Sequence, residues 1–342
     1  MGGFGISVTP LSSPSLPLRL YPIKSFFVNP IAALNNKPKL SYEFKEGQTQ
    51  YFHQLASGLK MEVIEQRGIT DGAKKLGQPL VFVHGSYHAA WCWAEHWLPF
   101  FSGFGFDCYA VSLLGQGESD TPFPLVPGNL ETHASDIGDF IQKKLTQPPI
   151  LVGHSFGGLV VQYYIARIRN KQFAATKGLF PDLSGAALLC SVPPTGNSGI
   201  VWRYIFTKPI VAYKVTLSLA AKAFQTDLSL CRETYFSQAM DNHLLMRYQK
   251  LMTESSRTPM FDLRKLNASL PVPSVPKSAI EIFILGSSDD MIVVWVLLTA
   301  GVLGKVYAVL IVQISINTGQ SSIRRNWQIL WCEPNLYRRS GP

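Results

Sequence analysis

The sequence predicts an α/β fold, with a mostly parallel β-sheet covered by helices on both faces. Three observations carry this prediction. From about residue 50, short β-rich apolar segments alternate with longer segments of helical spacing. Apolar residues make up 46% of the chain and charged residues 15%, which supplies a large core and excludes a disordered or fibrous protein. The 342 residues are enough for two average domains or for one large domain with an insertion.

The elements follow one another along the chain without any internal repeat. Two alternating segments, Tyr51–Ala56 and Leu59–Gln66, predict an antiparallel pair around Ser57-Gly58. Further strands are predicted at Pro79–Val83, Asp107–Leu113, Pro149–Val152, Gly185–Ser191 and Ile280–Leu285. Helical spacing is found in Ala89–Phe101, His133–Leu145 and Phe156–Arg169. Residues 193–276 are helical in pattern and bounded by proline-rich segments, so we expect a helical cap inserted over the sheet.

The cysteines and the charges exclude two further classes of protein. Five scattered cysteines, without any Cys-x-x-Cys pair, predict neither a disulfide scaffold nor a structural zinc site. The net charge of +9 belongs to the two ends, because residues 1–42 and 291–342 each carry about four of these charges and the body between them is nearly neutral. A nucleic-acid groove needs basic residues clustered on the folded part. We therefore expect no nucleic-acid partner.

The first 45 residues are predicted to be a leader outside the fold. Residues 1–42 are rich in Ser, Pro and Asn and contain no acidic residue, which is typical of an organellar transit peptide. Four prolines between residues 10 and 22 interrupt the apolar run that a secretory signal requires. A chloroplast (plastid) destination is the prediction. A mitochondrial address and a tail without any address are the alternatives.

The other end, residues 291–342, is an atypical hydrophobic and then basic tail. The 25 residues 292–316 contain 15 Ile, Leu or Val and a single charge, Lys305. Each apolar residue favours insertion by roughly 0.3–0.6 kcal/mol and a central lysine opposes it by about 3 kcal/mol, so hydropathy permits a membrane span. A buried helix followed by a strand is the competing interpretation, favoured by Gly301, Gly304 and the β-rich segment 306–316.

The strongest chemical signal is the segment Gly153-His154-Ser155-Phe156-Gly157. It follows a predicted strand and precedes a predicted helix, which is the context of a nucleophile elbow. Such a turn lifts the serine hydroxyl above the sheet edge, next to a helix N-terminus that favours developing negative charge. Glycine is needed at 153 and 157 because a Cβ there would collide with neighbouring backbone. Ser155 is the candidate nucleophile.

A second signal is His84-Gly85-Ser86 at the end of an earlier strand. Acyl transfer needs two backbone N–H groups aimed at the oxyanion. We expect them from Phe156, the residue after the nucleophile, and from Ser86, where Gly85 lets the loop approach closely. His84 is expected to brace this loop, and His154 points elsewhere on its sharp turn. Neither is expected to act as the base.

Together, these motifs resemble the α/β-hydrolase fold superfamily. The resemblance rests on the elbow, on residues 84–93 with their Ala-Trp-Cys-Trp, and on Leu114-Gly115-Gln116-Gly117-Glu118-Ser119, and covers about residues 50–290. Residues 84–93 look like those of the plant esterase and hydroxynitrile-lyase-like branch, and the acid-free leader like that of its plastid members. The resemblance implies a serine hydrolase acting on an apolar ester or related carbonyl substrate, without metal or organic cofactor.

The same resemblance implies a catalytic triad in the order nucleophile, acid, histidine. Asp289 in Leu285-Gly286-Ser287-Ser288-Asp289 fits the acid, with Asp290 as the alternative. No histidine follows Asp289, and we expect nothing after Met291 to resemble the family's closing helix, strand and helix. The catalytic histidine is therefore unknown. The tail could stem from an alternative transcript or shifted frame, a membrane anchor could replace the last segment, or His243 in the cap could serve as base.

Two other classes of function stay open beside the esterase. One is a catalytically inactive hydrolase scaffold that binds a small apolar ligand. The other is a membrane-tethered hydrolase held by residues 292–316.

Overall fold

The computed structural model describes residues 40–69, 77–124, 126–168, 179–196, 205–273 and 280–287, and the backbone of 306–312. All of these residues belong to one compact unit that spans residues 39–342. Residues 1–39 of the predicted leader and most of the predicted tail lie outside the described residues. The plastid destination accordingly stays a prediction.

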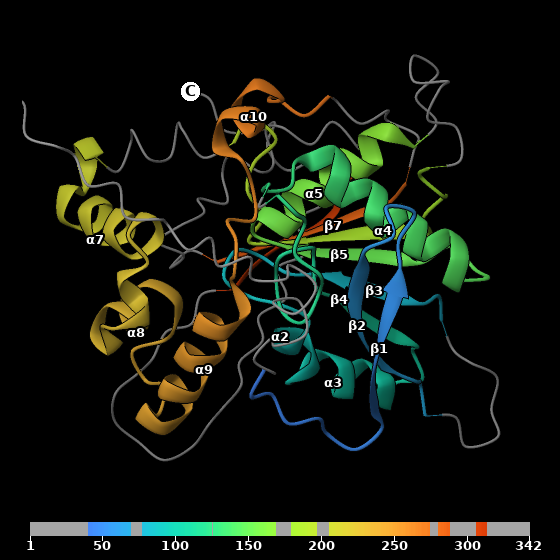
Figure 1. Cartoon of the computed structure of the whole chain (residues 1–342), viewed down its shortest axis with the longest axis horizontal. Coiled ribbons are helices and arrows are strands. Elements are labelled where there is room, and N and C mark those ends of the chain that lie inside the picture. The colour runs from blue at the N-terminus through green and yellow to red at the C-terminus, as the bar shows by residue number, and fades with distance from the viewer. Residues whose placement is uncertain are drawn as a thin grey trace, which may run out of the picture. The chain divides into compact units, whose positions relative to one another are not determined.

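Within the described residues, eight strands form one sheet in the order β1-β2-β4-β3-β5-β6-β7-β8 (Figure 1). Their bounds are β1 Gln48–Gln54, β2 Lys60–Gln66, β3 Leu80–Val83, β4 Cys108–Val111, β5 Ile150–His154, β6 Gly185–Leu189, β7 Ile282–Ser287 and β8 Val306–Val312. β1 pairs antiparallel with β2, and β2 pairs antiparallel with β4. The other five pairs, β4-β3, β3-β5, β5-β6, β6-β7 and β7-β8, are parallel. The predicted α/β fold with a mostly parallel sheet is confirmed.

Both faces of the sheet are covered, and β3 shows how the sequence achieves this. Successive strand residues point to opposite faces, and all four β3 residues are buried. Val81 and Val83 join the apolar cluster of helices α4 and α5, while Leu80 and Phe82 join that of α2 and α3. Figure 1 shows these two helix pairs flanking the strands. The helices are α2 Trp91–Ala94, α3 Trp97–Gly103, α4 Leu130–Lys144 and α5 Phe156–Arg167.

The cap enters between β6 and β7, as predicted, and its described part runs from residue 205 to residue 273. It contains α7 Pro209–Ala220, the short 3₁₀ helix η2 Ala223–Gln225, α8 Leu228–Tyr235, α9 Asn242–Ser255 and α10 Leu263–Ala268. Phe224, Cys231, Leu245 and Met252 are buried in the same apolar cluster as α2 and α3. The cap is therefore packed on the body through a shared core.

The last strand, β8, lies in the predicted tail, where no closing strand of the fold was expected. Nothing after Met291 was expected to resemble a closing strand, but β8 pairs with β7 in parallel, from Ile282 opposite Val306 to Ser287 opposite Val312. The strand of the competing interpretation, in the β-rich segment 306–316, is confirmed for residues 306–312. A parallel strand inside a sheet is a continuous apolar run, which is also the signature of a membrane span. The sheet thus continues beyond residue 290, where the sequence placed the end of the domain.

The start of the fold also precedes the predicted boundary at residue 50. Leu40 and Tyr42 are buried in the core beside α2. No helix in the described ranges is long and apolar enough to cross a bilayer. The rest of the 292–316 segment, apart from β8, lies outside the described residues.

Candidate active site

Ser155 occupies the turn between β5 and α5, where the sequence predicts a nucleophile elbow. Its backbone has φ 54° and ψ −122°, a conformation that residues other than glycine rarely adopt. Such strain persists only where surrounding contacts enforce it. Here the Ser155 N–H donates to the Leu189 carbonyl at 3.1 Å, and the Ser155 carbonyl accepts from Gly158 and Val192 at 3.0 Å each. Backbone contacts from β6 and α5 therefore hold the turn.

The two glycines of the elbow are required for the reason that the sequence predicts. A Cβ on Gly153 would lie 2.6 Å from the Gly157 carbonyl oxygen. A Cβ on Gly157 would lie 2.4 Å from the carbonyl oxygen of His84 and 2.5 Å from that of Val83. Real Cβ contacts are not this short, so α5 can approach the ends of β3 and β5 only at glycine.

The loop after β3 lies directly against Ser155. Val83 and Gly153 are register partners in neighbouring parallel strands, so both strands end at the same edge of the sheet. A Cβ on Gly85 would lie only 2.9 Å from the Ser155 Cβ. The loop that carries Ser86 thus packs against the elbow, directly after which α5 begins at Phe156. The first N–H groups of a helix lack intrahelical partners. The oxyanion role of Ser86 and Phe156 stays a prediction that this placement supports.

His84 makes the contacts of a bracing residue. It is fully buried, its Nδ1 lies 2.8 Å from the Gly85 carbonyl oxygen, and its Nε2 accepts the Leu113 N–H at 3.1 Å. An Nδ1–H donor and an Nε2 acceptor together define a neutral ring. Burial lowers the pKa of His84 to about 3, so the ring stays neutral across the physiological range. His84 thus ties the loop after β3 to the segment that follows β4.

None of the other described histidines is hydrogen-bonded to the Ser155 hydroxyl. All seven lie in the described part of the chain, and none there forms a hydrogen bond to the Ser155 hydroxyl. His53, His88, His96 and His133 bond instead to Asp139, the Ser86 carbonyl, the Tyr248 hydroxyl and the Met260 carbonyl, respectively. His243 is exposed near the start of α9.

His154 is adjacent to Ser155 in sequence but is a weak base. Its ring lies beside that of His88, with 6.3 Å between centroids, and beside Trp93 at 6.4 Å. Burial, together with the neighbouring His88, lowers the pKa of His154 to about 4. A general base works best with a pKa near the operating pH. His154 is therefore poorly suited to take the Ser155 proton at neutral pH.

Residues 80–312 match the sequence profile of a family described as the Alpha/beta hydrolase family, over more than half of the chain. The protein is an α/β hydrolase. Its curated relatives include a non-heme chloroperoxidase of Streptomyces lividans, 30% identical over 124 residues. Those residues are 36% of this chain and 40% of the relative, so the chain matches less than half of that protein's length.

Solved structures share the fold of this α/β hydrolase at low identity. An esterase from Exiguobacterium antarcticum is 18% identical with a TM-score of 0.54, over 78% of this chain and 91% of the esterase. The N-acyl homoserine lactonase AidH, complexed with N-hexanoyl homoserine, is 16% identical with a TM-score of 0.55, over 78% and 89%. These likenesses show the α/β-hydrolase fold. The plant plastid branch stays a prediction.

The acid of the predicted triad lies outside the described residues. β7 ends at Ser287, two residues before Asp289, and Asp290 follows. Among the described residues, no group of three His, Cys, Asp or Glu side chains could hold a metal ion.

Two contributors to the site of this α/β hydrolase were missed in the sequence. The first is Tyr87, at φ 64°, whose hydroxyl donates to the Leu219 carbonyl of α7. The Tyr87 ring also packs edge-on against Phe224 at 5.0 Å, which joins the loop after β3 to the cap. No local signal marks Tyr87, because its partners lie more than 100 residues away in the chain.

The second is Glu62, a buried carboxylate of β2. It accepts hydrogen bonds from the side chains of Gln50 and Ser112, both at 2.6 Å, and from the Glu118 N–H at 2.8 Å. Burial raises the pKa of Glu62. The carboxylate organises the Gly-Gln-Gly-Glu loop that carried part of the family resemblance. The sequence alone does not single out Glu62, because β2 also contains Glu65 and only the fold shows which acid is buried.

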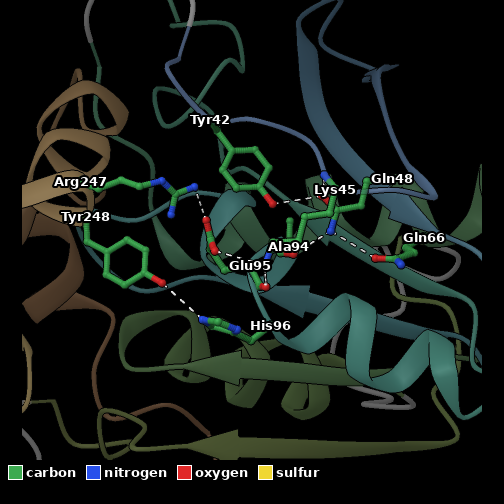
Figure 2. A network of polar contacts seen from close by, with 9 residues as sticks. All are labelled: Tyr42, Lys45, Gln48, Gln66, Ala94, Glu95, His96, Arg247 and Tyr248. Carbon is green, nitrogen blue, oxygen red and sulfur yellow. Dashed lines mark hydrogen bonds and ion pairs between the residues drawn. The ribbon is translucent and has the colours of Figure 1, made fainter. Parts of the chain in front are cut away.

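The cap is fastened to the body by the polar network in Figure 2. Glu95, between α2 and α3, is 6% exposed and lies between two cations from different segments. Arg247 of α9 forms an ion pair with its carboxylate, and Lys45 Nζ lies 3.3 Å from its Oε2. Beside it, His96 Nε2 lies 3.3 Å from the hydroxyl of Tyr248, also in α9. Glu95 thus joins the segment before β1, the body and the cap.

Replacing Glu95 by alanine is expected to lower the free energy of unfolding by about 1–3 kcal/mol, because Lys45 and Arg247 lose their shared partner. The side chains of Lys45 and Arg247 are about a third or more exposed, so water compensates part of the loss. Urea unfolding of Glu95→Ala, Arg247→Ala and the double variant measures the coupling. If the losses of the two single variants added up to that of the double variant, the coupling free energy would be zero, which would contradict a specific ion pair between Glu95 and Arg247.

Proposed function

We propose that this α/β hydrolase cleaves small carboxylic esters through Ser155. The observation that carries the proposal is the strained turn of Ser155 at the N-terminus of α5, with the Gly85 loop packed against it. A serine in this position is presented above the sheet edge, beside backbone N–H groups that stabilise a negatively charged oxygen. That solved esterase and lactonase structures share the fold supports the same reaction class.

The reaction divides into two steps. In the first, the Ser155 oxygen attacks the ester carbonyl while its proton passes to solvent. The oxyanion accepts hydrogen bonds from Ser86 and Phe156, and the alcohol leaves with a proton from water. In the second step, water attacks the acyl group on Ser155 and releases the carboxylic acid. The apolar cap favours substrates with apolar acyl or alcohol groups.

Because no histidine ring of the described chain is hydrogen-bonded to Ser155, we expect this reaction to be slow. A serine at its free pKa is a poor nucleophile, and a histidine normally activates it. In a serine protease, loss of the histidine lowers kcat on the order of 10⁶-fold, which is about 8 kcal/mol of transition-state stabilisation. We therefore propose slow turnover, in which the oxyanion hole and substrate binding supply the acceleration.

A second candidate is a binding scaffold that holds an apolar carbonyl ligand without turning it over. The observation that favours it is the histidine inventory: none of the seven rings bonds to Ser155, and the sequence contains no histidine after His243. A scaffold of this kind would keep the site but form no acyl-enzyme.

Labelling of the full chain with a fluorophosphonate probe, read by intact mass, separates the two candidates. The proposal expects one adduct per chain during long incubation at pH 8–9, and no adduct on Ser155→Ala. Ser86→Ala is the matched control, because it keeps the backbone N–H and should be labelled within a few-fold of the parent rate. A cooperatively folded parent without any adduct between pH 6 and 9 would overturn the proposal and favour the scaffold.

A further inference from the structure

Helix α7 of the cap is apolar but is barely buried. Only Ala212 and Ser218 are buried among its twelve residues. Ile210 is 73% exposed, Tyr213 68% and Leu217 36%. A helix that is apolar around most of its circumference is normally enclosed by protein or lipid. Among the elements of the described chain, α7 packs mainly against α8 and η2, and Figure 1 shows it next to α8.

The exposed side chains lie on one line along the helix. Residues three and four positions apart face the same side of a helix, and Ile210, Tyr213 and Leu217 have this spacing. We call these three residues the α7 stripe. A 12-residue helix is about 18 Å long, so the stripe is long enough to lie in a lipid interface and too short to cross a bilayer.

The charge around the stripe indicates the occupant. From Leu183 to Thr226 the sequence contains no acidic residue. Lys208 stands at the start of α7 and Lys222 just after its end, while Lys214 pairs with Glu233 of α8 at 2.5 Å. A second copy of the chain would place the same lysines against one another, which is unfavourable. An anionic surface would instead pair with them.

We propose that the α7 stripe binds the surface of anionic membranes, with α7 lying in the interface plane. Ile210 and Leu217 would enter the headgroup and acyl boundary, where apolar burial supplies the binding free energy. The Tyr213 ring, apolar with a polar tip, suits the same depth. Lys208 and Lys222 would contact the anionic headgroups from the two ends of the helix. This contact is independent of residues 292–316 and of catalysis at Ser155.

Sedimentation of the full chain with vesicles tests the proposal. The vesicles are phosphatidylcholine alone, or phosphatidylcholine with about 30% phosphatidylglycerol. We expect binding to the anionic vesicles and at least tenfold weaker binding of Ile210→Ser/Leu217→Ser. The matched control, Phe100→Ser/Phe104→Ser, removes two exposed rings of the α3 region, each 58% exposed, and should bind like the parent. Thermal unfolding of each variant confirms that the fold is kept.

A second pair of variants tests the charge. Lys208→Gln/Lys222→Asn should weaken anionic binding on the order of tenfold or more, since each lysine near the surface contributes about fivefold. Arg264→Gln/Lys265→Gln on α10 removes the same charge elsewhere and should change binding little. Three results would overturn the proposal: no binding by the full chain, equal binding by the stripe variant, or a change of oligomer mass in that variant, which would assign the stripe to a second copy.

Discussion

Replacing Gly157 by alanine is expected to lower the free energy of unfolding by roughly 3 kcal/mol or more. The new Cβ would lie 2.4 Å from the His84 carbonyl oxygen and 2.5 Å from that of Val83, and because both atoms are backbone, no flexible side chain can move away. α5 would have to withdraw from the end of β3. Because the same contact seats the turn of Ser155, labelling by a fluorophosphonate should be lost together with stability. Urea unfolding and intact mass measure the two effects.

Gly103→Ala is the matched control for this substitution. Gly103 ends α3, and a Cβ on it would have no atom within 4 Å. Its stability should change by about 1 kcal/mol or less, with a gain expected from helix propensity. If Gly157→Ala and Gly103→Ala changed the free energy of unfolding by the same small amount, the close contacts around Gly157 would not restrict this position, which would contradict the prediction.

The rate of Ser155 labelling is expected to rise about tenfold per pH unit between pH 6 and 9, or on the order of a thousandfold in total. Without an imidazole partner, the reactive species is the Ser155 alkoxide, whose fraction grows tenfold per unit far below its pKa. A histidine base gives a different profile, because the rate levels off once the ring has lost its proton. With the pKa of His154 lowered to about 4, a rate that depended on His154 would already be flat above pH 5.

Labelling rates at a series of pH values, corrected for probe hydrolysis, decide between these profiles. A plateau above pH 7 would contradict solvent-driven attack and would show that a histidine reaches Ser155. His88→Gln, His154→Gln and His243→Gln would then identify the ring, since only loss of the true base restores the continuous rise. Added imidazole provides an independent check, because it should accelerate labelling only where no internal base operates.

The elbow could be predicted because most of it is local. A strand, Gly153, Ser155, Gly157 and a helix follow one another without a gap, and the steric need for glycine at 153 arises within this segment. The need at 157 arises from the end of β3, which lies more than 70 residues earlier in the chain. The bracing role of His84 was predicted for the same reason, since its loop and strand end are contiguous.

The parts that failed or were missed depend on partners distant in the sequence. An apolar run such as 306–312 has the same composition in a membrane span and in a parallel strand, and only its pairing with β7 distinguishes them. Tyr87 and Glu95 are unremarkable in their own segments. Their roles arise from contacts with α7 and α9, which propensity and periodicity do not encode.

The cap is inserted between β6 and β7, which are neighbours in the sheet, and it can therefore be replaced without a change in the sheet. β6 and β7 pair in register from Ala186 opposite Ile282 to Leu189 opposite Leu285, although about 90 residues separate the two strands in the chain. Closing a loop of that length costs only about 0.6 kcal/mol more for each doubling. Selection or engineering can therefore exchange the cap while the sheet that seats Ser155 is kept.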